Sequence, residues 1–200
     1  MEKILVLGAT GSIGHHVVKF LENDDQKKVT VYVRNPDKLD QNLNPSVKIL
    51  VGDMQDQDKL ITAFKNQDVV VASLSGDWLK HAKNIVTVLK KSNVKRIYWV
   101  SGLGISNEVP GRVGMILSGY AKRYPEYIQA AKEIVASKTP YTLIRAANLT
   151  NGNNLEYHLQ YPGQKLHQEN VDRKAVAKFI VDMINDENDF GLNESIGITN

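Results

Sequence analysis

The sequence contains no cysteine among its 200 residues. This absence excludes disulfide bonds, thiolate metal sites and cysteine nucleophiles. The chain also lacks a large excess of charge of one sign, because its 25 Lys and Arg residues nearly balance its 22 Asp and Glu residues. These charges are interspersed along the chain, so the composition gives no support for nucleic-acid binding.

Long hydrophobic runs are lacking as well. Apolar runs such as residues 69–72 are far too short to cross a bilayer. Residues 1–8 hold too short an apolar stretch for a signal peptide and no small-x-small cleavage site. We therefore expect a cytoplasmic protein without membrane contact, either a monomer or a homodimer. Its length suits one domain, residues 1–200, whose core needs no covalent cross-links.

Short β-branched runs alternate with helical patterns along most of the chain. Apolar residues at helical spacing recur between these runs, as at Leu79, Ala82, Val86 and Leu89. Near-continuous apolar strands are typical of a parallel sheet that is covered on both faces. The pattern therefore predicts an α/β fold with a doubly wound parallel sheet. The predicted strands are residues 3–7, 29–33, 47–51, 68–72, 96–100 and 141–144.

Two long stretches rich in Gly, Asn and Pro interrupt this alternation, at residues 102–119 and 148–170. Both follow late strands, where ligand-facing loops lie in a doubly wound sheet. We expect irregular structure in both. We further expect residues 148–170 to form a loop region that faces a substrate cleft.

A glycine-rich segment joins the first predicted strand to the first predicted helix. Residues 8–14 read Gly-Ala-Thr-Gly-Ser-Ile-Gly, a spacing variant of the dinucleotide-binding fingerprint. Glycines let the backbone turn sharply and approach a pyrophosphate, and the helix presents free N–H groups to the anion. An ordinary tight turn is the alternative. The position between strand and helix favours a Rossmann dinucleotide site.

Arg34 closes the second predicted strand, twenty residues after Gly14. An NAD site usually carries Asp or Glu at this position to accept ribose hydroxyls, whereas an arginine accommodates the 2′-phosphate of NADP. A solvated arginine at a strand end is the other interpretation. No acidic residue follows until Asp37. The pattern therefore favours NADP over NAD, with NAD as the alternative.

Several short motifs follow one another along the chain. Residues 8–14 are followed by Val-Arg-Asn-Pro at 33–36, Gly-Asp-Met at 52–54, Val-Ser-Gly-Leu-Gly at 100–104 and Leu-Ile-Arg at 143–145. In this order the sequence resembles the atypical short-chain dehydrogenase/reductase superfamily, in its NAD(P)H-binding, NmrA-like branch of flavin-reductase-like and epimerase-like proteins. The resemblance extends from residue 1 to about residue 185, and the first motif is its most specific part.

The resemblance implies a cofactor site built from residues that follow successive strands. Asp53 also has an alternative role as a cap near the next helix, and Ser73 as a turn residue. The implied contacts are Gly8, Thr10, Gly11, Ser12, Ile13 and Gly14 at the pyrophosphate, Arg34 at the 2′-phosphate, Asp53 and Met54 at the adenine, Ser73, Leu74 and Ser75 at the ribose, and Ser101 and Gly102 at the nicotinamide.

The usual catalytic pattern of the superfamily is incomplete in this sequence. Typical members pair a serine with Tyr-x-x-x-Lys, where the lysine lowers the pKa of the phenol one helical turn away. Only Tyr161 and Lys165 have this spacing, and Pro162-Gly163 between them predicts a turn. We interpret that match as accidental. The Ser-Ser pair common after the fifth strand is Ser101-Gly102 here.

The remaining catalytic candidates are Ser101 and three tyrosines, Tyr120, Tyr124 and Tyr127. The tyrosines would offer a stacking face or a proton, unless they only pack a helix. No histidine pairing suggests a metal site. With a cofactor site and these catalytic candidates, the expected partner is a small-molecule substrate.

Three functions follow, in decreasing order of support. The first is an NADPH-dependent reductase of a planar acceptor such as a flavin, quinone or tetrapyrrole, where orientation matters most. The second is a catalytically silent redox sensor that binds NADP and acts through a protein partner. The third, an isomerase or dehydratase of small sugars, requires the Tyr/Lys pair that the sequence does not supply.

Overall fold

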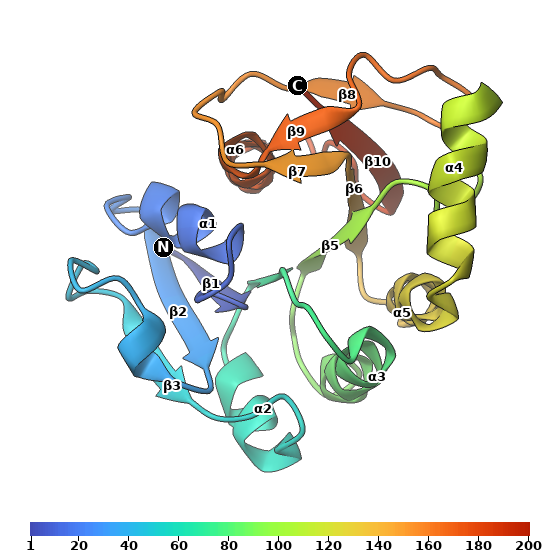
Figure 1. The fold of residues 1–200 in the computed structure, drawn as a ribbon. Helices are drawn as coiled ribbons and strands as arrows, with labels where there is room; N and C mark the ends of the chain where they lie inside the picture. Colours follow the sequence, from blue (N-terminus) through green and yellow to red (C-terminus); the bar gives the residue numbers. More distant parts are fainter.

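The computed structural model describes residues 1–200 as an eight-stranded sheet with helices on both faces (Figure 1). The strand order is β3-β2-β1-β4-β5-β6-β10-β8, and every neighbouring pair is parallel except β10 with β8. The predicted doubly wound α/β fold is therefore confirmed. The strands are β1 (Glu2–Leu7), β2 (Lys27–Val33), β3 (Lys48–Val51), β4 (Val69–Ala72), β5 (Arg96–Gly102), β6 (Tyr141–Ala146), β8 (His158–Gln160) and β10 (Glu194–Thr199).

Six α-helices cover the sheet (Figure 1). One face carries α1 and α6, and the other carries α2, α3 and α5, with α4 beside α5. A separate parallel pair, β7 (Asn148–Thr150) with β9 (Asn170–Asp172), lies near the start of α6. None of the helices combines the length and the apolar character needed to cross a bilayer. The helices are α1 (Gly14–Leu21), α2 (Gln57–Phe64), α3 (Trp78–Leu89), α4 (Gly111–Lys122), α5 (Pro125–Ala136) and α6 (Arg173–Ile184).

The two cores follow from the alternation of side chains along each strand. On β1, Ile4 and Val6 pack into the cluster beneath α1 and α6, while Leu5 and Leu7 pack beneath α2, α3 and α5. All four are fully buried, and burial of each such side chain contributes about 1.5–3 kcal/mol to folding. Burial on both faces explains why the sequence reads as continuous apolar runs.

The edge strand β3 differs from the prediction of burial on both faces. Ile49 and Val51 are 44% and 51% exposed. β3 is the last strand at this edge of the sheet, and helix α1, which packs on β1 and β2, does not cover the face that carries Ile49 and Val51.

Both predicted irregular stretches contain regular structure. Residues 102–119 include most of α4, whose glycines obscured its helical pattern, and residues 148–170 include β7 and β8. The tyrosine-bearing segment is two helices, because Pro125 starts α5 directly after Tyr124. β10, which the sequence pattern did not predict, lies between β6 and β8.

The order of the first six strands has its switch point between β1 and β4. In open α/β sheets, ligands bind outside the carboxyl ends of the strands at such a point. The glycine segment after β1 and the serines after β4 lie at this edge.

Candidate functional site

Two glycines of the glycine segment pack so closely against backbone that neither position admits a side chain. Gly8 has a φ of +86°, and a Cβ on it would collide with the carbonyl oxygen of Ser73. A Cβ on Gly14 would collide with the carbonyl oxygen of Gly8. The Gly11 N–H donates to that same carbonyl at 2.8 Å. The bare backbone and the start of α1 form a cradle that fits a pyrophosphate.

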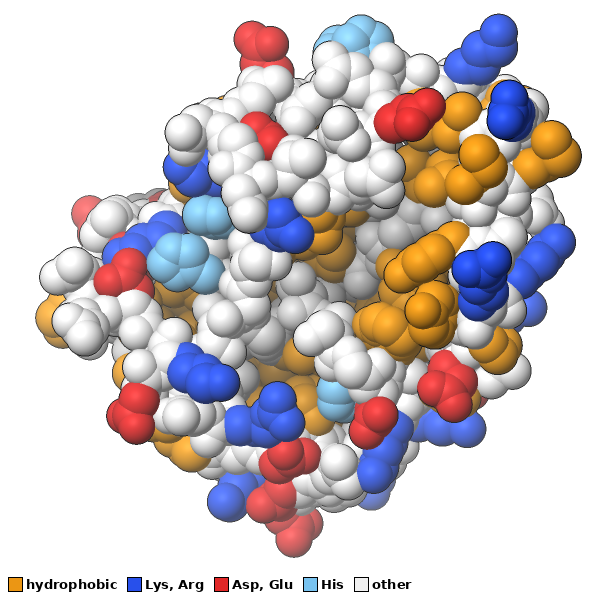
Figure 2. All heavy atoms as spheres, in the orientation of Figure 1, with side chains coloured by type: hydrophobic (Ala, Val, Ile, Leu, Met, Phe, Trp, Pro, Cys, Tyr) orange, Lys and Arg blue, Asp and Glu red, His pale blue; other side chains and the backbone are white.

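A central cleft of about 600 Å³ opens beside this cradle, over the carboxyl ends of β4, β5 and β6. Figure 2 shows a hollow in the middle of this face, with hydrophobic side chains gathered along one side. Its volume lies in the range of small-molecule sites. The cleft brings together the predicted residues Gly11, Ser12, Ile13, Ser73, Leu74, Ser75, Ser101, Gly102, Tyr120, Tyr124 and Tyr127.

A second cavity of about 450 Å³ lies on the other side of Gly11 and Ser12. Among the predicted cofactor residues it adds Thr10. Its cations are Lys38 and Arg173, and Asp40 is its only carboxylate. Cations beside a helix N-terminus suit phosphate groups. Its basic side chains are His15, His16, Lys38 and Arg173.

Arg173 lines both cavities, although it was not among the residues predicted for the site. Its Nε donates to Ser12 Oγ at 3.1 Å, and its Nη1 donates to Asn151 Oδ1 at 2.7 Å. Arg173 and Lys174 occupy the first turn of α6, where the helix dipole disfavours cations. That unfavourable placement is the sequence signal that marks Arg173 as a functional candidate.

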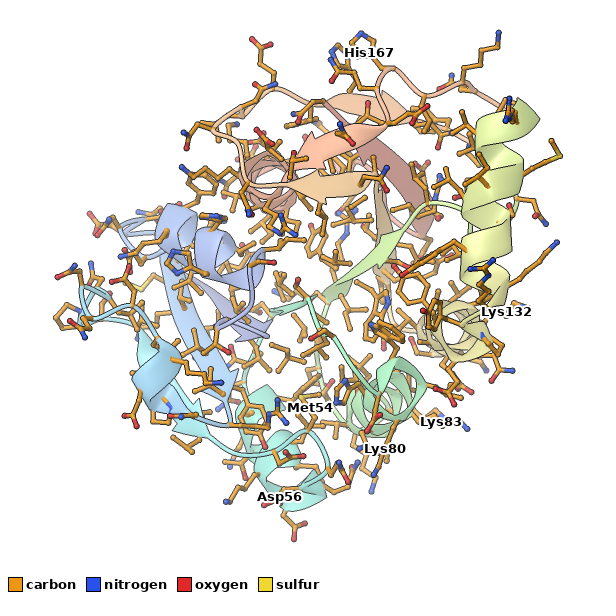
Figure 3. All side chains as sticks on the ribbon, in the orientation of Figure 1. Met54, Asp56, Lys80, Lys83, Lys132 and His167 are labelled. Atoms are coloured by element: carbon orange, nitrogen blue, oxygen red, sulfur yellow. The ribbon has the colours of Figure 1, made fainter.

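The predicted adenine and 2′-phosphate residues line neither cavity. Arg34 is exposed at the end of β2, and Asp53 Oδ1 accepts the Gln55 N–H at 2.8 Å. The Met54 side chain is buried in the core between α2 and α3 (Figure 3), so its backbone alone remains for contact. Burial lowers the pKa of nearby His81; the Asp77 and Asp53 carboxylates raise that pKa, and the charge of Arg34 lowers it. Arg34 and Asp53 therefore face the same end of the site.

Aromatic side chains form one wall of the central cleft. The rings of Trp78 and Tyr127 are 5.0 Å apart, and those of Tyr120 and Tyr124 are 5.2 Å apart. Trp78 also approaches Tyr124 edge-on at 6.2 Å. This aromatic wall, defined by Trp78, Tyr120, Tyr124 and Tyr127, spans α3, α4 and α5. Trp78 was not among the residues predicted for the site.

Ser101 and Tyr127 meet at the floor of the cleft. Ser101 Oγ is buried beside the Tyr127 phenol, and no other group of the chain lies in hydrogen-bonding position to it. Burial raises the pKa of Tyr127, against the opposite effects of the Ser101 hydroxyl and the Gly102 backbone. The phenol is therefore protonated at neutral pH and able to donate.

The lysine of the usual catalytic pattern has no counterpart here. No lysine lines the cleft, and Lys132 on α5 is exposed (Figure 3). Tyr161 and Lys165 are separated by a turn in which Gly163 has a φ of +85°. The predicted turn is confirmed, and neither Tyr161 nor Lys165 lines the central cleft. The serine and tyrosine are present without a cation to lower the pKa of the phenol.

Comparison with known proteins identifies the family. Residues 8–187 match the NAD(P)H-binding family, and the chain belongs to it. A Rossmann-fold NAD(P)-binding family protein from Shigella flexneri is 31% identical, with a TM-score of 0.85 over 100% of this chain and 93% of that one. A short-chain dehydrogenase/reductase from Veillonella parvula, solved with NADP, is 25% identical, with a TM-score of 0.88 over 100% of this chain and 94% of that one.

Among curated proteins, isoeugenol synthase 1 from Petunia hybrida is 28% identical over 90% of this chain. Phenylcoumaran benzylic ether reductase 1 from Arabidopsis thaliana is 29% identical over 71% of it. The chain spans only 58% and 47% of these two relatives. Together the comparisons confirm the resemblance to the atypical short-chain dehydrogenase/reductase superfamily.

Proposed function

We propose that the protein is an NADPH-dependent reductase of a planar acceptor such as a flavin, a quinone or a tetrapyrrole, within the NmrA-like branch. One observation carries the proposal. One cleft, which begins at the glycine cradle, is lined by both the aromatic wall and the Ser101 hydroxyl. Relatives named as reductases support the reaction class.

The assignment of the cofactor half of the site rests on the shape of the backbone and on the position of positive charges. A nicotinamide cofactor supplies a hydride when it is bound. The cradle and the N–H groups of α1 would hold the pyrophosphate, with Arg173 at its side. Arg34 and Lys38, on either side of Pro36, would meet a 2′-phosphate. The NADP complex of the Veillonella parvula protein supports this choice over NAD.

The acceptor half follows from the aromatic wall. Trp78, Tyr120 and Tyr124 would stack on a planar ring and orient it. Reduction of a quinone to a hydroquinone takes one hydride and one proton. Tyr127, protonated at neutral pH, or water would supply that proton. An electron-poor ring needs orientation more than a strong acid, which suits a site without the lysine.

The test measures the initial rate of NADPH oxidation with flavin mononucleotide and with 2-methyl-1,4-naphthoquinone as acceptors. The same rates are then measured with NADH in place of NADPH. Arg34→Glu should weaken NADPH binding at least about tenfold and leave NADH binding nearly unchanged. Lys28→Glu makes the same charge change at the opposite end of β2 and should affect neither cofactor. Equal losses for both cofactors in Arg34→Glu would rule out the 2′-phosphate contact.

A second function, a catalytically silent redox sensor, is favoured by the missing lysine. A sensor needs tight and selective NADPH binding without turnover. NADPH binding together with no oxidation in the presence of flavins, quinones or tetrapyrroles would support this function against the reductase.

A further inference from the structure

A smaller groove of about 240 Å³ adjoins the central cleft. The two share Leu103, Leu117, Tyr120 and Asn148 as lining residues, so one opens into the other. The groove continues between α4 and residues 166–169. The side chains that line the groove alone are Val113, Ile116, Leu166 and Glu169.

The groove is chemically unlike the cleft. Its lining is apolar except for Asn148 and Glu169. A volume of 240 Å³ is below that of a typical whole-ligand pocket, about 300–1,000 Å³. The groove therefore fits a part of a ligand whose remainder lies in the cleft.

The apolar surface that borders the groove is exposed. Ile116 and Tyr120 are 64% and 59% exposed on α4. Figure 2 shows hydrophobic side chains gathered over this helix, beside the hollow. A ligand that buries this apolar surface is bound more tightly, by a free energy that is proportional to the buried area. No charged side chain stands where the groove opens from the cleft, so an apolar chain can pass.

We propose that this groove binds an apolar arm carried by the acceptor, so that the substrate class is a planar redox ring with an alkyl or prenyl-like side chain. The inference rests on the proposed function, because the ring occupies the aromatic wall. The arm leaves the ring past Leu117 and Tyr120 and lies against Val113, Ile116 and Leu166. The shared lining residues favour a substrate arm over a separate partner.

The experiment compares two acceptors with the same ring, 2-methyl-1,4-naphthoquinone and its 3-decyl derivative. Their KM and kcat are measured with NADPH. Their binding to the NADP⁺-loaded protein is measured separately, by the quenching of tryptophan fluorescence. Trp78 in the cleft is the responsive fluorophore, because Trp99 is buried in the core. We expect the decyl compound to bind at least about tenfold more tightly and to have the lower KM.

The variant is Ile116→Gln, and its matched control is Met115→Gln. Met115 is the neighbouring residue on α4, is 70% exposed and does not line the groove. Ile116→Gln should weaken binding of the decyl compound about fivefold and leave the short quinone unchanged. Met115→Gln should change neither value. Both side chains are exposed, so folding is expected to survive both changes.

The outcomes separate the groove from the reaction. Equal affinity for the two quinones, or equal effects of the two substitutions, overturns the groove while leaving the reductase intact. Selective binding of the decyl compound without turnover supports the groove and counts against the reductase. Sedimentation shows whether the occupant is a second copy of the chain, since dimers lost in Ile116→Gln would also overturn the proposal.

Discussion

The two halves of the site are held together by different means. The cofactor half, which comprises the glycine cradle and the residues after β2 and β3, is fixed mainly by close packing and hydrogen bonding of backbone against backbone. The acceptor half, which comprises residues 101–127 and 146–169, is assembled from contacts between segments far apart in the sequence.

A buried ion pair anchors the acceptor half. Arg145 on β6 contacts Glu108 at 3.0 Å, and neither side chain is more than 1% exposed. Glu108 also accepts the N–H groups of Gly104 and Ser106, so it shapes the loop between β5 and α4. Arg145 Nη1 donates further to Gln160 of β8 at 3.0 Å. The ion pair thus links three segments of the acceptor half.

The largest expected effect breaks this ion pair. Arg145→Met should lower the free energy of unfolding by about 3–5 kcal/mol, because it leaves the Glu108 charge buried without a partner. Urea unfolding measures the loss. The double variant Arg145→Met with Glu108→Gln should recover part of it. If the single and double variants are equally unstable, the buried charge is not the cause.

The ion pair between Glu108 and Arg145 also makes the stability of the fold depend on pH. Burial opposes ionisation of Glu108, but hydrogen bonds from its own backbone N–H and from Gly104, together with Arg145, hold its pKa below the usual value. The ionised form therefore stabilises the fold above about pH 4.3, and this contribution is lost as pH falls through the lower, folded-state pKa. Between pH 5 and pH 3, the wild-type protein should lose more stability than Glu108→Gln.

The next effect concerns the cradle. Gly8→Ala should lower the free energy of unfolding by about 3 kcal/mol and abolish measurable NADPH binding, because the new Cβ meets the Ser73 carbonyl. Gly163→Ala is the matched control, since Gly163 has nearly the same φ but open space around it. It should cost only about 1 kcal/mol and leave binding intact. Similar costs at both positions would show that backbone strain alone matters.

A smaller effect is expected at the boundary between the halves. Arg173→Gln should weaken NADPH binding about tenfold, because a hydrogen bond to a charged group contributes about 1.5–3 kcal/mol. Lys174→Gln is the control, because Lys174 bonds Asn153 and lines neither cavity. Isothermal titration of both variants separates a direct contact from general loss of positive charge. Equal weakening would favour the latter.

The smallest expected effect concerns the proton. Tyr127→Phe should lower kcat for the short quinone about fivefold, because water replaces the phenol as donor. Since burial raises the pKa of Tyr127 above the usual 10, the wild-type rate should stay independent of phenol ionisation up to pH 10. Tyr120→Phe, on the exposed rim, should leave kcat unchanged. An unaltered rate in Tyr127→Phe would assign the proton to water.

Sequence patterns predicted the cofactor half better than the acceptor half for a physical reason. The glycine spacing, the six leading strands and Arg34 are local signals, in which each residue type reflects its own backbone or its immediate neighbours. The contact between Glu108 and Arg145 joins residues 37 positions apart, and no local pattern encodes it. Helix α4 was missed because Gly111, Gly114 and Gly119 weaken helical propensity, and tertiary packing against α5 compensates.

The site residues divide in the same way. Ser101 and Tyr127 were predicted as separate candidates, but their meeting on the cleft floor depends on how α5 packs on the sheet. Trp78 and Arg173 were missed because their roles arise only when α3 and α6 are placed around the cleft. Arg173 had the one usable signal, a cation in the first turn of a helix.

The position of β10 has a consequence for biosynthesis. Strand β8 pairs only with β10, which is made more than thirty residues later. A chain emerging from the ribosome can pair β1 to β6 as they appear, but β8 must wait for residues 194–199. The sheet can therefore begin to form at β1 to β6 during translation, whereas β8 joins it only after β10 has been made.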